Sequence, residues 1–183
     1  MNVFWERGFS ATSLSDLSEA TGMNRPSLYA AFGDKRTLYL KALQSYSARM
    51  GRELAATLAA DELERALTGF YYKMVEKFVS GAGEARGCMV ASSASADAMN
   101  DADVRAVLNG SVERLDAALV ERFRRAADEG LLSPRDVGRL GPLATAVLHS
   151  LSVRARAGDN RRALRKFARE SVSLLLERAA SRG

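Results

Sequence analysis

The sequence predicts an all-α protein in which a short N-terminal three-helix domain precedes a longer helical bundle. Apolar residues recur every three or four positions along nearly the whole chain, and no segment shows the strict alternation typical of a strand. Only 3 prolines occur among 183 residues, so few helix breakers interrupt this pattern. Hydrophobic residues make up 47% of the chain, which is enough for a sizeable core.

The first strong helix signals flank residues 13–22. Ser13 is a good N-cap, and Asp16 lies three residues later in the capping-box position. Gly22 is suited to end this helix, because glycine adopts the left-handed conformation at little cost. Upstream, the apolar residues within 1–8 predict the tail of another helix.

A second short helix is expected after a three-residue turn. Asn24 is its N-cap, and Pro26 falls in the first turn, where a missing N–H costs nothing. This helix is expected to end at Phe32, and Asp34 is expected to cap the next one. Residues 13–32 therefore predict a helix-turn-helix, whose two short helices need apolar partners from the flanking helices.

The rest of the chain predicts a bundle of longer helices. We expect helices at 61–79, 88–98, 101–129, 134–157 and 160–180, with a loop at 81–87. Ser133, Pro134 and Asp136 form a strong helix start. Pro142 is expected to kink or divide its helix, and Asp159 is expected to cap the last one.

Composition narrows the class of protein. The formal net charge of +5 permits an anionic partner such as DNA without requiring one. A single cysteine excludes an internal disulfide framework and fits a reducing cytoplasm. No apolar run approaches the roughly 20 residues of a membrane span, and residues 1–20 lack a signal-peptide pattern.

Motifs for enzyme chemistry are missing from the sequence. The sole histidine, His149, lies in an apolar helix without Cys, Asp or Glu at metal-ligand spacing. There is no glycine-rich phosphate loop and no serine in a nucleophile context. We therefore expect a cytoplasmic protein that is not an enzyme, with no cofactor, metal or membrane association.

The stretch 4–43 resembles the N-terminal domain of TetR-family transcriptional regulators in the order and spacing of its residues. The matching residues are Phe4, Gly8, Phe9, Thr12, Ser13, Leu17, Gly22, Ser27, Leu28, Tyr29, Phe32, Lys35 and Leu38. The resemblance implies a DNA-binding domain at 1–45 and an effector-binding and dimerisation domain at 46–183. Family members normally have a longer first helix, so either that segment is absent from this chain or the protein is naturally short.

The resemblance also implies a DNA-binding face. The expected DNA-contacting residues are Thr12, Ser13, Arg25, Ser27, Tyr29 and Lys35. The helix 25–32 would lie in the major groove, with Arg25 reading a guanine or contacting a phosphate. Tyr29 and Lys35 match the family's backbone-contacting tyrosine and phosphate-binding lysine, although plain packing and plain solvation remain the alternatives for them.

The function implied by the resemblance is that of a ligand-responsive repressor, which binds a palindromic operator as a homodimer and is released by a small-molecule effector. The expected dimer interface comprises Leu143, Val147, Leu151, Leu164, Ala168, Val172 and Leu175. The expected effector pocket comprises Phe70, Tyr71, Met74, Phe78, Cys88, Met89, Met99 and Leu115. For both sets, packing in the core of one protomer is the competing interpretation.

A second hypothesis is a helical ligand-binding or thiol-based redox sensor that does not bind DNA in this truncated form. Cys88 lies at the start of a predicted helix and two residues from Arg86, and both features favour a thiolate. The competing interpretation of Cys88 is a small buried hydrophobic residue.

Overall fold

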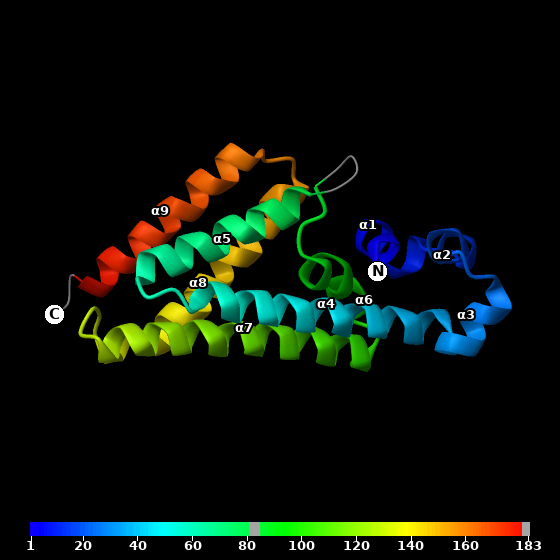
Figure 1. The fold of residues 1–183 in the computed structure, drawn as a ribbon, viewed down its shortest axis with the longest axis horizontal. Helices are drawn as coiled ribbons and strands as arrows, with labels where there is room; N and C mark the ends of the chain where they lie inside the picture. The colour runs from blue at the N-terminus through cyan, green and yellow to red at the C-terminus, as the bar shows by residue number, and fades with distance from the viewer. Residues whose placement is uncertain (81–84, 181–183) are drawn as a thin grey trace. The chain divides into compact units, whose positions relative to one another are not determined.

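Every regular element in the described part of the chain is a helix, which confirms the predicted fold class. A computed structural model describes residues 1–80 and 85–180 (Figure 1). The elements in chain order are α1 (Asn2–Ala11), α2 (Leu14–Thr21), α3 (Arg25–Phe32), α4 (Lys35–Leu58), α5 (Leu63–Val79), the π-helical turn η1 (Val90–Ala94), α6 (Ser95–Asp97), α7 (Ala102–Asp128), α8 (Pro134–Arg156) and α9 (Arg161–Ala180). Within these ranges, no helix combines the length and the apolar character needed to cross a membrane.

The predicted helix-turn-helix is present, and its caps are the expected ones. The Ser13 hydroxyl accepts a hydrogen bond from the Asp16 amide at 3.1 Å, and the Asp16 carboxylate accepts one from the Ser13 amide at 2.8 Å. Gly22 ends α2 in the left-handed region with φ 69°. The Asn24 side chain accepts the Ser27 amide at 2.9 Å and so starts α3.

The central proline of α8 does not divide that helix. Pro142 lies inside the continuous span Pro134–Arg156. Its ring removes one amide donor, whose acceptor in a regular helix would be the carbonyl of Gly138. Both residues are exposed, so water can satisfy that carbonyl. Of the two expected effects of Pro142, a kink or a division, the division does not occur.

Two other predictions from the sequence differ from the structure. The side chain that caps α9 belongs to Asn160, which accepts the Ala163 amide at 3.0 Å, whereas Asp159 forms an ion pair with Arg154 at 3.5 Å. The helix expected at 88–98 is irregular, because η1 and the three-residue α6 share that segment. In the predicted loop 81–87, residues 81–84 lie outside the described residues.

The chain forms two compact units. The first consists of Met1–Arg49 and Cys88–Ser111, and the second of Met50–Gly87 and Val112–Gly183. The first unit therefore includes η1, α6 and the start of α7, which the sequence analysis assigned to the C-terminal domain. α1 contacts η1, so this later segment of the chain is part of the packing around the helix-turn-helix.

An aromatic cluster joins α1 to α4 in the first unit. The rings of Phe4 and Phe9 each contact the Tyr39 ring at a tilted angle, with 5.1 Å between the centroids of each pair. Trp5 meets Tyr46 edge-on, with centroids 5.0 Å apart. All of these except Phe9 are almost fully buried. Aromatic pairs contribute about 0.5–1.5 kcal/mol each beyond their buried area, so the cluster fixes α1 on α4.

The second unit is built from helices packed on one another. α5 lies against both α8 and α9, as Figure 1 shows. Most apolar residues of α5 are buried, and Leu67, Phe70 and Met74 are fully buried. Ion pairs from Glu76 to Arg161 at 3.0 Å and to Arg165 at 2.8 Å link α5 to α9 at the edge of this packing.

Candidate nucleic-acid interface

The helix α3 presents most of its surface to solvent. Leu28 is its one fully buried residue, 4% exposed, and it holds the helix against the domain. Arg25 and Ser27 are exposed, and Tyr29 is 48% exposed. A large aromatic side chain held outward on a short capped helix is available to a partner, because it is not needed for the core.

Arg25, at the first position of α3, is held from α2. Its Nη2 donates to the hydroxyl of Ser15 at 2.8 Å. A guanidinium has five N–H donors, so this bond orients the group while leaving donors for a further acceptor. The contact with Ser15 depends on the angle between two helices, so it could not be predicted from the sequence.

Lys35 begins α4 and lies over an aromatic ring. Its Nζ is 4.4 Å from the centroid of the Phe9 ring, which restrains the side chain near the N-terminus of the helix. Asp34 caps the same helix by accepting the Thr37 amide at 2.6 Å, and this bond is the main reason that the pKa of Asp34 is lowered. Lys35 is therefore the cation that can attract a phosphate at this helix end.

Two of the expected DNA contacts have local partners. Thr12 is 1% exposed, and its hydroxyl donates to the Gly8 carbonyl at 2.6 Å, so burial removes this side chain from any DNA surface. Ser13 is exposed, but its hydroxyl bonds the Asp16 carboxylate at 2.7 Å. Arg7 also binds Asp16, at 2.6 Å, and hydrogen bonds from Ser13 are the main cause of the lowered pKa of Asp16.

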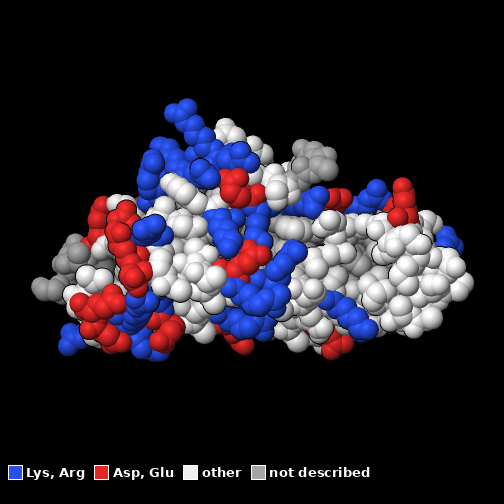
Figure 2. Space-filling model, viewed as in Figure 1, with Lys and Arg blue, Asp and Glu red and all other residues white. Residues whose placement is uncertain are grey.

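The net positive charge of the chain lies in the second unit. The first unit has 7 Lys and Arg against 7 Asp and Glu, and the second has 20 against 15. Figure 2 shows basic side chains gathered over the second unit, whereas the surface around α2 and α3 carries few charges. The net charge of +5 therefore does not mark the candidate interface, although it permitted DNA as a partner.

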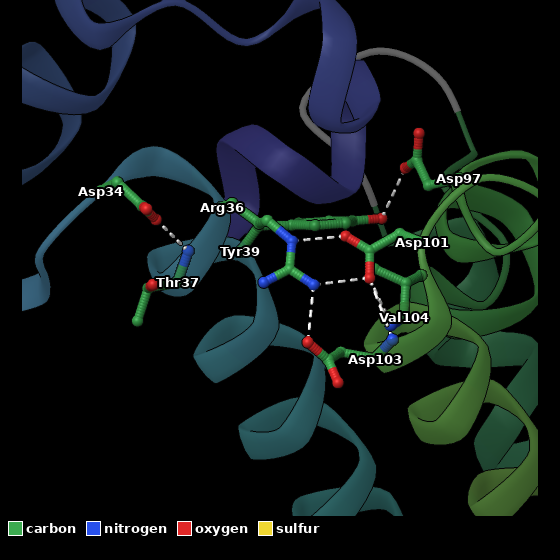
Figure 3. Close-up of polar contacts among 8 residues, drawn as sticks. All are labelled: Asp34, Arg36, Thr37, Tyr39, Asp97, Asp101, Asp103 and Val104. Atoms are coloured by element: carbon green, nitrogen blue, oxygen red, sulfur yellow. Dashed lines mark hydrogen bonds and ion pairs between the residues drawn. The ribbon is translucent and has the colours of Figure 1, made fainter.

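Three aspartates accept hydrogen bonds from side chains in the first turns of α4. We call Asp97, Asp101 and Asp103 the acidic cluster. Arg36 donates from Nε to Asp101 Oδ2 at 2.6 Å and from Nη2 to Asp101 Oδ1 at 2.8 Å and to Asp103 Oδ2 at 2.6 Å (Figure 3). The Tyr39 hydroxyl donates to Asp97 at 3.0 Å. The partners in this network are 58 to 67 positions apart along the chain, so the sequence pattern gave no sign of it.

Most of the expected dimer residues are part of the core of one protomer. Those that are at most 8% exposed are Leu151, Leu164, Ala168, Val172 and Leu175. The apolar residues that α8 and α9 do expose are Leu143 at 55%, Val153 at 67% and Leu174 at 63%. Val147 is half-buried. The five buried residues were therefore wrongly placed on an outer surface. An apolar stripe on a helix does not show which partner covers it.

The expected pocket residues are mostly fully buried. Those with at most 1% exposure are Phe70, Tyr71, Met74, Phe78 and Met89. The Tyr71 hydroxyl donates to the Ala144 carbonyl at 2.8 Å, and burial raises the pKa of Tyr71. Leu115 is half-buried. Met99 is 78% exposed, which does not fit the wall of an interior pocket.

Cys88 does not have the environment expected of a reactive thiol. Burial raises the pKa of the Cys88 thiol, and this effect outweighs the opposing hydrogen bonds from the Ala91 and Val90 amides and from the Tyr46 hydroxyl. The raised pKa disfavours a thiolate, opposite to the expectation from the sequence, and the Cys88 side chain is half-buried. Burial likewise lowers the pKa of His149. Across residues 1–80 and 85–180, no group of three His, Cys, Asp or Glu side chains could hold a metal ion.

A capped helix-turn-helix with an outward-facing second helix and a lysine at the next helix start defines a protein of the DNA-binding helix-turn-helix class. Comparison with known proteins makes the class more specific. Residues 1–42 match the family model described as bacterial regulatory proteins, tetR family. The chain is 28% identical over 177 residues to the HTH-type transcriptional repressor ComR of Escherichia coli (strain K12), covering 95% of this chain and 84% of ComR.

Solved structures agree with this result. A cysteine mutant of the TetR family transcriptional regulator CifR, complexed with 26 bp double-strand operator DNA, is 31% identical with a TM-score of 0.82. The alignment covers 93% of this chain and 90% of that one. A TetR-family regulator from Cytophaga hutchinsonii has the same fold at 22% identity, with a TM-score of 0.82 and coverage of 99% and 90%. The chain belongs to the TetR family of transcriptional regulators.

Proposed function

We propose that the protein is a ligand-responsive repressor that acts in the cytoplasm, binding a palindromic operator as a homodimer. The observation that carries the proposal is the exposed outer face of α3 on a capped helix-turn-helix. Two similarities support it, because ComR is named a repressor and the CifR structure contains operator DNA.

In this proposal α3 enters the major groove, and its N-terminal residues face the base edges. Arg25 reads a guanine with the donors that Ser15 does not use, because a guanidinium fits the O6 and N7 acceptors of guanine. Ser27 and Tyr29 contact bases or phosphates from the exposed face. Lys35 and the amides at the start of α4 bind a phosphate. Thr12 is not among the contacts, because it is buried.

The dimer is proposed to form through the outer faces of α8 and α9. Leu143, Val153 and Leu174 are large apolar residues that one protomer leaves exposed, and a two-fold partner would cover them. Replacing Leu143 and Leu174 by Glu should yield monomers in sedimentation experiments, whereas Leu164→Ala, in the core, should destabilise the fold instead. Dimers that persist in the double variant would place the interface elsewhere.

The effector is proposed to be a small apolar or aromatic molecule. It would lower operator affinity by binding more tightly to the conformation that fits DNA poorly. The candidate contacts on α5 are Phe70, Tyr71, Met74 and Phe78, which offer an apolar surface. Because these side chains are fully buried, the ligand would have to rearrange them on entry.

A gel-shift titration on the DNA upstream of the gene tests the proposal. The expected result is a discrete complex whose affinity falls steeply as salt rises. A scrambled duplex of the same length is the control. Failure to bind the upstream DNA more tightly than the scrambled duplex at any salt concentration would contradict the proposal. The competing idea of a thiol sensor that does not bind DNA is disfavoured by the raised pKa of Cys88.

A further inference from the structure

The first turns of α4 carry two kinds of residue. Lys35 lies over the Phe9 ring at the N-terminus of the helix. Arg36 and Tyr39 are turned toward the acidic cluster (Figure 3). Tyr39 also packs on Phe4 and Phe9 from α1, so the same turns connect to the N-terminal helix. The orientation of the start of α4 is thus determined by its contacts on both sides.

Asp101 bonds both the first turn of α7 and the Arg36 side chain of α4. Its Oδ1 accepts the amides of Asp103 at 3.0 Å and Val104 at 3.1 Å, and so caps α7. The same carboxylate binds Arg36 through both oxygens. Arg36 is the main reason, ahead of the Val104 amide, that the pKa of Asp101 is lowered to about 2. Asp101 is therefore ionised at every pH at which the protein would meet DNA.

We propose that Arg36 is a positioning residue for DNA binding, held by Asp101 and Asp103 so that Lys35 and the N-terminus of α4 keep the orientation that a phosphate requires. Its guanidinium is already committed to two carboxylates and does not itself bind DNA. A bidentate pair fixes direction as well as distance, which a single lysine contact would not do. The inference rests on the proposed function, since it assigns Arg36 a role in that same interface.

The opposite charges of Arg36 and Asp101 allow positioning to be distinguished from simple electrostatic attraction to DNA. Arg36→Gln removes a positive charge near the DNA, and Asp101→Asn removes a negative one. Coulomb's law alone would make the first weaken DNA binding and the second strengthen it. If the pair acts by positioning, both variants should weaken binding, by about three- to tenfold. Asn also caps helices about as well as Asp, so Asp101→Asn keeps α7 capped.

The experiment measures operator affinity by fluorescence anisotropy over a series of KCl concentrations. Lys35→Ala should weaken binding and reduce the salt slope by about one, because it removes a phosphate contact. Arg36→Gln and Asp101→Asn should weaken binding with the wild-type slope, and the double variant should bind no more weakly than either single one. Arg36→Lys should recover part of the loss. Arg49→Gln, which removes a cation elsewhere on α4, is the control and should bind like wild type.

Thermal midpoints of all variants show whether each one folds. A stronger complex for Asp101→Asn, or a reduced salt slope for Arg36→Gln, would overturn the inference and make Arg36 a direct phosphate contact. Wild-type affinity in both single variants would overturn it as well. If the wild-type protein itself does not bind the operator, the proposed function fails, and that outcome is distinct from these.

Discussion

Gly141 is predicted to be required for the contact between α7 and α8. A Cβ added at Gly141 would lie 2.3 Å from Val120 Cγ2, 3.2 Å from the Val120 amide nitrogen and 3.4 Å from the Asp116 carbonyl. The first distance is far inside van der Waals contact, and the 3.2 Å approach involves backbone, so a rotamer change of Val120 cannot relieve both. The contact with the Asp116 carbonyl is an ordinary one. The helices must shift, and overpacking of this kind costs about 1–3 kcal/mol.

The same helix supplies a matched control. A Cβ at Gly138, one turn earlier, would meet nothing within 4 Å. Gly138→Ala should stabilise the protein by about 0.5–1 kcal/mol, because alanine favours the helix more than glycine does. Gly141→Ala has the same helix propensity gain, so the difference in unfolding free energy between the two variants isolates the clash.

Thermal unfolding followed by circular dichroism measures that difference. For a chain of this size about 2–4 °C corresponds to 1 kcal/mol, so Gly141→Ala should melt roughly 2–12 °C below Gly138→Ala. Val120→Ala added to Gly141→Ala should recover part of the loss, because it removes the nearest atom. Equal melting temperatures for the two alanine variants would refute the close approach of α7 and α8 at Gly141.

Three further predictions concern single side chains. Tyr71→Phe should lower the free energy of unfolding by about 1 kcal/mol, since it deletes one buried hydrogen bond to Ala144; urea denaturation checks this, and an unchanged midpoint would contradict the bond. Cys88 should react with iodoacetamide at pH 8 at least about tenfold more slowly in the folded than in the urea-unfolded protein, and faster as pH rises, because its pKa is raised; equal rates would restore the sensor hypothesis. Arg25→Ala should cost about 1–3 kcal/mol of operator affinity and relax specificity at one base pair, as measured on single-base operator variants. A uniform loss across those variants would make Arg25 a phosphate contact.

The sequence by itself determined the local structure of the DNA-binding region. Caps and turns depend on residues three or four positions apart, so the roles of Ser13, Gly22 and Asn24 follow from the amino-acid order alone. The family resemblance over 4–43 arises from the same short-range pattern. Arg25, Ser27 and Tyr29 were placed on the candidate interface for this reason, and their exposure is compatible with that placement.

Tertiary structure alone decided which partner each apolar or charged face meets. The stripes that contain Leu151 on α8 and Leu164 on α9 have the same periodicity whether a second subunit or α5 covers them, and only the packing shows that both residues are internal. Likewise, helix periodicity cannot show that Arg36 meets Asp101 across 65 positions. Periodicity identifies the faces of a helix, but the neighbour of a face depends on how the whole chain folds.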